Sequence, residues 1–139
     1  MERKSICIIG TGLIGGSLAI QLHEKKISSR LIGVETNQLH AEAAIRLELV
    51  DEILEMDDAI AQSEVIILAI PVDAAVKLLP VLLNKITNQI VIDVGSTKAE
   101  LVEKVKQHEK RGRYVATHPM WGTEYSGPTA AVRGAFENK

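Results

Sequence analysis

The amino-acid sequence predicts one α/β domain, in which a doubly wound, mainly parallel β-sheet carries helices on both faces. Strand-like and helix-like segments alternate along the chain, which is the order that builds such a sheet. The run Val65–Ile70 is apolar at every position, as expected for a strand covered on both sides. A glycine-rich turn at residues 10–15 joins the first strand to the first helix. With 139 residues, of which 46% are apolar, the chain is long enough to bury one core.

The expected elements follow from short apolar runs and from the helical spacing of apolar residues between them. We expect six strands, at Ser5–Ile9, Arg30–Glu35, Val50–Ile53, Val65–Ile70, Ile90–Asp93 and Tyr114–Thr117. The strand at 50–53 has the weakest pattern. We expect five helical stretches, at Gly12–Glu24, Leu39–Glu48, Ala59–Ala61, Asp73–Asn84 and Lys98–Lys110. No repeat, low-complexity tract or linker divides the chain, so we assign residues 1–139 to a single domain.

The composition argues against several classes of partner and location. The formal net charge is −2 and both signs are scattered along the chain, so nothing indicates nucleic acid or an anionic membrane surface. No apolar run approaches the roughly 18 residues of a membrane span, and the charged N-terminus is not a signal peptide. The single cysteine, Cys7, cannot form an internal disulfide and fits a reducing compartment. We therefore expect a cytoplasmic protein with Cys7 buried in the first strand.

The motif with the clearest chemistry is the run Gly10-Thr11-Gly12-Leu13-Ile14-Gly15. It follows a strand and opens a helix, which is the context that a dinucleotide-binding motif requires. Gly10 would permit the tight turn, Gly12 would let the backbone approach a pyrophosphate, and Gly15 would let helix and strand pack closely. The free amides and the dipole at the helix start favour a phosphate there. We therefore expect these six residues to bind a dinucleotide.

A second signal, Glu35, specifies which dinucleotide. It lies 23 positions after Gly12 (35 − 12), close to the usual spacing of about 20 for the acid that holds the adenosine ribose. A 2′-phosphate about 4 Å from this carboxylate would cost on the order of 4 kcal/mol per unit charge pair. The next residues, Thr36-Asn37-Gln38, supply no arginine to offset that repulsion. We expect NAD as the cofactor, in preference to NADP.

Other candidate residues follow the later strands, because ligands bind beyond the carboxyl ends of strands in open α/β sheets. Ile70 and Pro71 could wall the cofactor or simply form a rigid turn. Ser96 could meet a ligand or only cap the helix that follows it. His118, with an ordinary pKa near 6.5, suits a proton acceptor at the nicotinamide end, although its position alone leaves a structural role equally open.

We expect no metal site. The acidic residues near the weak strand have no His or Cys among them, and solvated surface explains them better. These residues are Asp51, Glu52, Glu55, Asp57 and Asp58. The histidines on charged helical segments are expected at the surface. They are His23, His40 and His108.

Three motifs together resemble the prephenate dehydrogenase family, and the resemblance spans the whole chain. They are the glycine turn with Gly16-Ser17, the run Asp93-Val94-Gly95-Ser96-Thr97-Lys98, and the block His118-Pro119-Met120-Trp121-Gly122-Thr123-Glu124-Tyr125-Ser126-Gly127. The third block is the most specific. Trp121 departs from the small residue that relatives often carry, without disturbing the motif. The resemblance implies a Rossmann-like fold and NAD-dependent oxidative decarboxylation of prephenate to 4-hydroxyphenylpyruvate, on the route to tyrosine.

The resemblance also implies roles for individual residues. His118 would polarise or deprotonate the ring hydroxyl as hydride leaves for the nicotinamide. Ser96 would orient His118 and touch substrate or cofactor. Glu124 resembles a family residue at the pocket mouth, and Gly122 and Thr123 of the same block would contact the substrate. We therefore expect His118 and Ser96 to be catalytic.

Members of this family carry a second, helical domain that builds a dimer and supplies basic groups for the substrate carboxylates. We expect that domain to be absent from this chain, so that the 139 residues bind NAD weakly and turn over little or nothing. We cannot assign Arg111, Arg113 or Arg133 to the site. The amino analogue arogenate is an alternative substrate. A non-catalytic NAD-binding regulatory domain and another β-hydroxyacid-type dehydrogenase are further alternatives, although the regulatory reading leaves the His118 block without a role.

Overall fold

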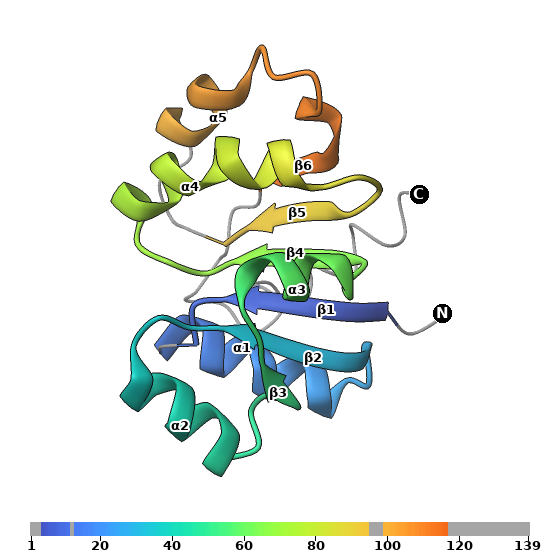
Figure 1. Cartoon of the computed structure of the whole chain (residues 1–139), viewed down its shortest axis with the longest axis vertical. Coiled ribbons are helices and arrows are strands. Elements are labelled where there is room, and N and C mark those ends of the chain that lie inside the picture. The colour runs from blue at the N-terminus through green and yellow to red at the C-terminus, as the bar shows by residue number, and fades with distance from the viewer. Residues whose placement is uncertain (1–3, 12, 95–98, 117–139) are drawn as a thin grey trace.

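The computed structural model describes residues 4–11, 13–94 and 99–116. Six strands form one parallel sheet in the order β3-β2-β1-β4-β5-β6 (Figure 1). The strands are β1 (Lys4–Ile9), β2 (Ser28–Val34), β3 (Glu52–Ile53), β4 (Val65–Leu68), β5 (Ile90–Asp93) and β6 (Tyr114–Ala116). The helices are α1 (Leu13–Glu24), α2 (Gln38–Arg46), α3 (Met56–Ala61), α4 (Val72–Lys85) and α5 (Ala99–Val105), with a short 3₁₀ helix, η1 (Arg111–Arg113). The order confirms the doubly wound sheet, because the two halves wind outward from β1 and β4.

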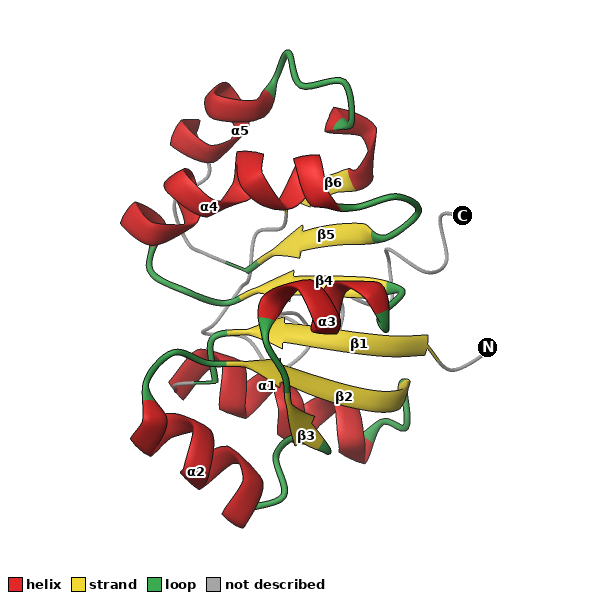
Figure 2. Ribbon diagram, viewed as in Figure 1, coloured by secondary structure: helices red, strands yellow, loops and turns green. Residues whose placement is uncertain are grey.

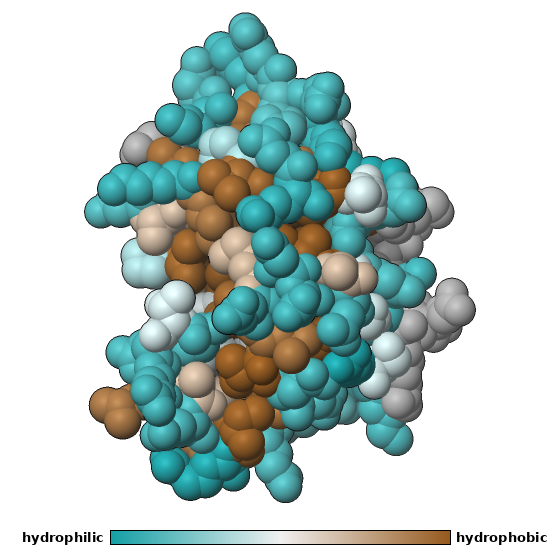
Figure 3. Space-filling view, viewed as in Figure 1, coloured by the Kyte–Doolittle hydropathy of each residue, from teal (hydrophilic) through white to brown (hydrophobic). Residues whose placement is uncertain are grey.

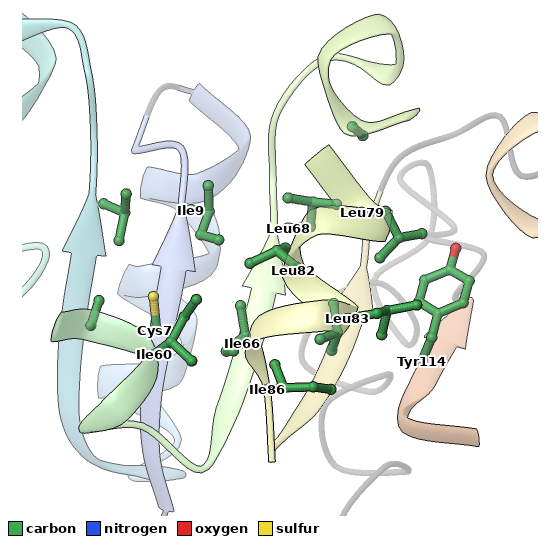
Figure 4. Close-up of a cluster of buried hydrophobic side chains, with 14 of the residues drawn as sticks. Cys7, Ile9, Ile60, Ile66, Leu68, Leu79, Leu82, Leu83, Ile86 and Tyr114 are labelled. Atoms are coloured by element: carbon green, nitrogen blue, oxygen red, sulfur yellow. The ribbon is translucent and has the colours of Figure 1, made fainter. Parts of the chain in front are cut away.

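The sheet is the middle of three layers (Figure 2). On one face, α1 and α2 pack on a cluster that includes Ile6, Ile8 and Ile67. On the other face, α3, α4 and α5 cover a cluster that includes Cys7 and Ile66 (Figure 4). Side chains alternate between the faces of a strand, and here both sets are buried, so the continuous apolar runs are explained by helices on both sides.

The fourth strand and the second helix both end earlier than expected, because the backbone turns there. The expected strand 65–70 ends at Leu68; the Ala69 amide still donates to the Ile9 carbonyl (2.9 Å), but the chain then leaves the sheet to start α4 after Pro71. The expected helix 39–48 ends at Arg46, because Glu48 adopts a left-handed backbone with φ of 58°. A residue in that conformation commonly ends a helix.

The regions around β3 and α5 differ more. β3 has only two residues. Just before it, the Asp51 amide donates to the Leu31 carbonyl (2.8 Å), and the Asp51 side chain accepts from the Leu31 amide (2.8 Å). α5 ends at Val105 instead of Lys110. In the turn that follows, the Lys110 amide donates to the ring of His108 (3.0 Å) before η1 begins.

The distribution of apolar and polar residues on the surface is consistent with the three layers. On the face that carries α3 and α4, apolar residues gather along the middle and polar residues flank them (Figure 3). Among the described residues, no helix combines the length and apolar character needed to cross a membrane.

Candidate nucleotide-binding site

The carboxyl ends of the parallel strands meet at one edge of the sheet, on the side to which the strand arrows point in Figure 1. The start of α1, Glu35 and the turn at residues 69–71 all follow strands at this edge. Because β2, β1 and β4 are neighbours, these three segments lie side by side. The edge therefore gathers most of the predicted cofactor-binding residues that the structure describes.

The glycine turn has no room for a side chain at Gly10 or Gly15. Gly10 has φ of 97°, and its amide donates to the Val34 carbonyl (2.9 Å), which ties the turn to β2. A Cβ atom at Gly10 would lie 2.6 Å from the Ala69 carbonyl oxygen, and one at Gly15 would lie 1.8 Å from the Gly10 carbonyl oxygen. Glycine at 10 is thus required by conformation, and glycine at 15 by the close approach of α1 to β1.

Thr11 joins the glycine turn to Glu35, the residue that directly follows β2. Its backbone amide donates to Glu35 Oε1 (2.7 Å), and its hydroxyl donates to the same oxygen (3.0 Å). Thr11 itself is buried, and the Glu35 side chain keeps 10% of its surface exposed. The carboxylate is therefore fixed at the mouth of the turn, with one edge open to solvent.

A second loop holds the other carboxylate oxygen. The Asn37 amide donates to Glu35 Oε2 (3.0 Å), and the Asn37 side chain caps α2 by accepting from the His40 amide (3.1 Å). Burial alone raises the pKa of Glu35, but the hydrogen bonds from Thr11 and Asn37 and the nearby His40 together lower it below its usual value of 4.5. The site therefore presents a fixed negative charge at neutral pH.

Sequence reasoning missed Asn37 and His40 as neighbours of Glu35. The His40 Nδ1 atom lies 4.0 Å from Glu35 Oε1. One signal was available: an Asn directly before a helical stretch is a common N-cap, and it fixes where the first turn of α2 lies. The side-chain contact between His40 and Glu35 depends on the packing of α2 on β2, which the sequence pattern does not give.

The remaining predicted cofactor-binding residues fall into two groups. Ile70 lies against the glycine turn, since its Cγ2 atom would be 2.8 Å from a Cβ atom at Gly10. Pro71 is exposed and is the N-cap of α4, and Leu13 and Ile14 begin α1. Several predicted residues lie outside the described ranges: Gly12, Ser96, His118, Gly122, Thr123 and Glu124.

The strands that precede Ser96 and His118 end side by side. Asp93 pairs with Ala116 in the parallel register of β5 and β6. Asp93 is buried, and the Tyr114 hydroxyl donates to its Oδ2 atom (3.4 Å). Burial and the nearby Asp93 raise the pKa of Tyr114 well above its usual range, so this hydroxyl remains a donor. In Figure 4 it points toward the carboxyl ends of the strands.

Two of the arginines that could not be assigned lie away from this edge. The Arg111 guanidinium lies over the Tyr114 ring, 5.6 Å from its centroid, and donates to the Tyr114 carbonyl (3.3 Å). Arg113 donates to the Asn88 carbonyl (2.9 Å). Both residues precede β6, whereas the site follows the strand ends, so neither sits with the glycine turn.

The acidic residues near β3 have partners of their own. Asp51 accepts from the Leu31 amide, Glu52 pairs with Arg30, and Asp57 lies 2.8 Å from Lys85 Nζ. The first two contacts link the β3 region to β2, and the third links α3 to α4. These three carboxylates therefore take part in interactions between elements of the fold.

This sheet order, with a tight glycine turn between β1 and α1, is the architecture of dinucleotide-binding α/β domains, and the fold and site place the chain in that class. The model of one family, the nucleotide-binding domain of prephenate dehydrogenase, matches residues 18–139, and the chain belongs to this family.

Individual relatives agree. The chain is 33% identical to prephenate dehydrogenase of Bacillus subtilis over 140 aligned positions, which cover 98% of this chain and 38% of that protein. The structure of prephenate dehydrogenase from A. aeolicus, in complex with hydroxyphenyl propionate and NAD+, superimposes with a TM-score of 0.76 at 27% identity, covering 91% of this chain and 45% of that one. Synechocystis arogenate dehydrogenase gives a TM-score of 0.67 at 29% identity, covering 91% and 44%. The chain thus spans less than half the length of these relatives.

Proposed function

We propose that this chain is the NAD-binding part of a dehydrogenase that oxidatively decarboxylates prephenate to 4-hydroxyphenylpyruvate, in tyrosine biosynthesis. The observation that carries the proposal is the Glu35 carboxylate, held by Thr11 and Asn37 beside the glycine turn. Membership of the prephenate dehydrogenase family supports the reaction class. The A. aeolicus relative was solved with NAD+, which supports the cofactor.

The residues present fit a dinucleotide. The glycine turn, residues 10–15, has no room for side chains at Gly10 and Gly15, and its backbone and the start of α1 would hold the pyrophosphate. Glu35 would accept a hydrogen bond from the adenosine ribose, and its charge favours NAD over NADP. Ile70 and Pro71 would wall the cofactor, and Ser96 would also contact it. Bound NAD+ supplies the hydride acceptor.

His118 and Ser96 are the proposed catalytic residues. Support comes from the register, since Ser96 and His118 follow Asp93 and Ala116, which are paired neighbours. His118 would take the proton of the ring hydroxyl while the hydride on the same ring carbon leaves to the cofactor. Loss of the ring carboxylate as carbon dioxide then leaves its bonding electrons in the ring, which becomes aromatic, and the ring oxygen regains a proton to give the phenol. Ser96 would orient His118 and meet the substrate.

Substrate recognition is proposed to be divided between this chain and sequence beyond it. Gly122, Thr123 and Glu124 would line the near side of the substrate site. The relatives are more than twice as long, which supports the idea that the groups for the substrate carboxylates and the contacts of a homodimer lie in a further helical domain. Arogenate is the second candidate substrate, because the chain also resembles an arogenate dehydrogenase.

Calorimetric titration of the chain with NAD+ and NADP+ tests the cofactor proposal. We expect NAD+ to bind more tightly than NADP+. Glu35→Ala should weaken NAD+ binding about tenfold or more, the typical loss of a hydrogen bond to a charged group, and should narrow the gap between the two cofactors. Glu42→Ala, on the exposed face of α2, is the matched control and should change neither affinity. A wild-type preference for NADP+ would contradict the proposal.

Turnover tests the catalytic proposal, with NADH followed at 340 nm. In a longer protein that carries this chain, we expect His118→Asn to lower prephenate turnover by about a hundred- to ten-thousandfold, the range for a positioned acid or base, with NAD+ affinity little changed. Unaltered turnover would remove His118 from the mechanism. A non-catalytic regulatory domain would show NAD+ binding with no turnover even at full length. Residues 1–139 alone should bind NAD+ weakly and turn over little or nothing.

A further inference from the structure

The carboxylate of Glu35 is nearly saturated with donors before any ligand arrives. An ionised carboxylate offers about four acceptor positions. Three are used, two on Oε1 by the Thr11 amide and hydroxyl, and one on Oε2 by the Asn37 amide. About one position therefore remains for a ribose hydroxyl. A nearby side chain that gains or loses a charge will therefore change which cofactor groups can bind beside this carboxylate.

His40 is such a group. Its Nδ1 atom lies 4.0 Å from Glu35 Oε1, which is too long for a hydrogen bond but within the range of an ion pair when the ring is protonated. Its side chain is 54% exposed, so the imidazole lies beside the carboxylate and is open to solvent. Two hydrogen bonds hold the His40 backbone near Glu35, because the Asn37 side chain accepts from the His40 amide while the Asn37 amide donates to Glu35.

The charges that face His40 are few. Its helix, α2, packs on β2 and β3. Glu35 directly follows β2, while Glu52 of β3 is paired with Arg30. On α2 itself, Glu42 is within reach of Gln38 (3.4 Å). Within the described ranges, Glu35 is the carboxylate that meets the ion-pair distance to His40.

We propose that His40 is a second specificity-determining residue for the cofactor, whose charge sets how strongly a 2′-phosphate on the adenosine ribose is rejected. The inference rests on the proposed function, since it assumes that Glu35 holds that ribose. Neutral His40 leaves the Glu35 charge uncompensated, so the phosphate is repelled. Protonated His40 offsets that charge and offers the phosphate a cation. Imidazole changes charge between pH 5 and 8, so discrimination against NADP+ weakens as the pH falls.

Glu35 does not cause this pH dependence, because its pKa is lowered and it stays ionised across that range. The 2′-phosphate does contribute, since a phosphate monoester gains a proton near pH 6 and is then repelled less by any acid. Variants at residue 40 separate the two effects. His40→Gln removes the titrating charge, and His40→Lys makes it permanent.

The experiment measures the dissociation constants of NAD+ and NADP+ by calorimetry from pH 5.5 to 8.5, at one ionic strength because such charges are screened by salt. In the wild-type chain, we expect the ratio Kd(NADP+)/Kd(NAD+) to fall about tenfold more between pH 8.5 and 5.5 than in His40→Gln. In His40→Lys, the ratio at pH 8.5 should lie about tenfold below the wild-type value. Tenfold corresponds to about 1.4 kcal/mol.

His23→Gln is the control, because this exposed histidine lies in the last turn of α1, whereas the glycine turn precedes the first turn of that helix. It should follow the wild-type curve. Equal pH dependence in wild type and His40→Gln, with an unchanged ratio in His40→Lys, would overturn the inference and leave the proposed function standing. Failure of the wild-type chain to bind NAD+ would overturn both.

Discussion

Glu35 holds two turns of the structure together, and this is a structural role in addition to the proposed ribose contact. Its two oxygens accept from Thr11, in the turn after β1, and from Asn37, in the turn before α2. The pKa of the folded-state carboxyl lies below its usual value of 4.5. The ionised group therefore stabilises the fold above pH 4.5, and this contribution is lost as the pH falls through the lowered folded-state pKa.

We accordingly expect Glu35→Gln to lower the free energy of unfolding by about 1–3 kcal/mol at pH 7, the usual value for hydrogen bonds to a charged group. The deficit should shrink as the pH drops below 4.5 and the wild-type carboxyl protonates. Urea denaturation followed by circular dichroism at several pH values measures it. Glu42→Gln, at an exposed carboxylate, should show no such deficit. A deficit that stays constant down to pH 2 would contradict the assigned origin.

The packing of α1 against β1 depends on a single position, Gly15. Gly15 and Gly16 are adjacent in this helix, yet their surroundings differ. A Cβ atom at Gly15 would lie 1.8 Å from the Gly10 carbonyl oxygen, which is backbone and cannot move aside. One at Gly16 would lie 3.3 Å from the Leu49 Cδ1 atom and 3.8 Å from the Thr11 carbonyl oxygen, which is an ordinary contact distance. The contact at Gly15 couples the helix to the end of β1, whereas the nearest atom to a Cβ at Gly16 is the tip of the flexible Leu49 side chain.

The two alanine substitutions should therefore have opposite results. Gly15→Ala should destabilise the chain by about 3 kcal/mol or more, because α1 must shift away from β1. Gly16→Ala should be neutral or stabilising by up to about 1 kcal/mol, since alanine favours the helix more than glycine does. Thermal unfolding of the two variants tests this, and equal midpoints would show that the helix adapts to a methyl group at either position.

Element types and their order could be predicted from the sequence, because apolar runs and helical spacing are local signals. The ends of elements could not. The expected strand 65–70 continued in apolar residues, yet the turn into α4 removes Ala69 and Ile70 from β4. At the site, the motif predicted the tight turn at Gly10 and the close packing of helix and strand at Gly15. The spacing from the motif also predicted the location of Glu35. The neighbours of Glu35, Asn37 and His40, could not be predicted, because their positions depend on how α2 packs on β2.

For the molecule as a whole, Cys7 provides a probe of global opening. It lies in β1 with no exposed surface, and burial raises the pKa of its thiol to about 12. Both conditions suppress the thiolate that reacts with disulfide reagents. The Cys7 thiol can therefore react only when the sheet opens and exposes β1.

We expect the native chain to resist labelling by Ellman's reagent at pH 8 and to react fully in urea. The native labelling rate should be lower than that of the unfolded chain by roughly the unfolding equilibrium constant, about 10³–10⁸ for small domains. The constant from urea denaturation gives the independent comparison. Rapid labelling without denaturant would mean that β1 opens locally.

The strand order has a consequence for synthesis. β1, made first, has β2 on one side and β4 on the other, and Ile6 finds its partner Val65 only after β2, β3 and three helices have been made. Until then one edge of β1 lacks its partner, in a strand whose two faces are both apolar. Such unpaired edges promote association between chains. A chain released before Val65 has been added would thus be prone to aggregate.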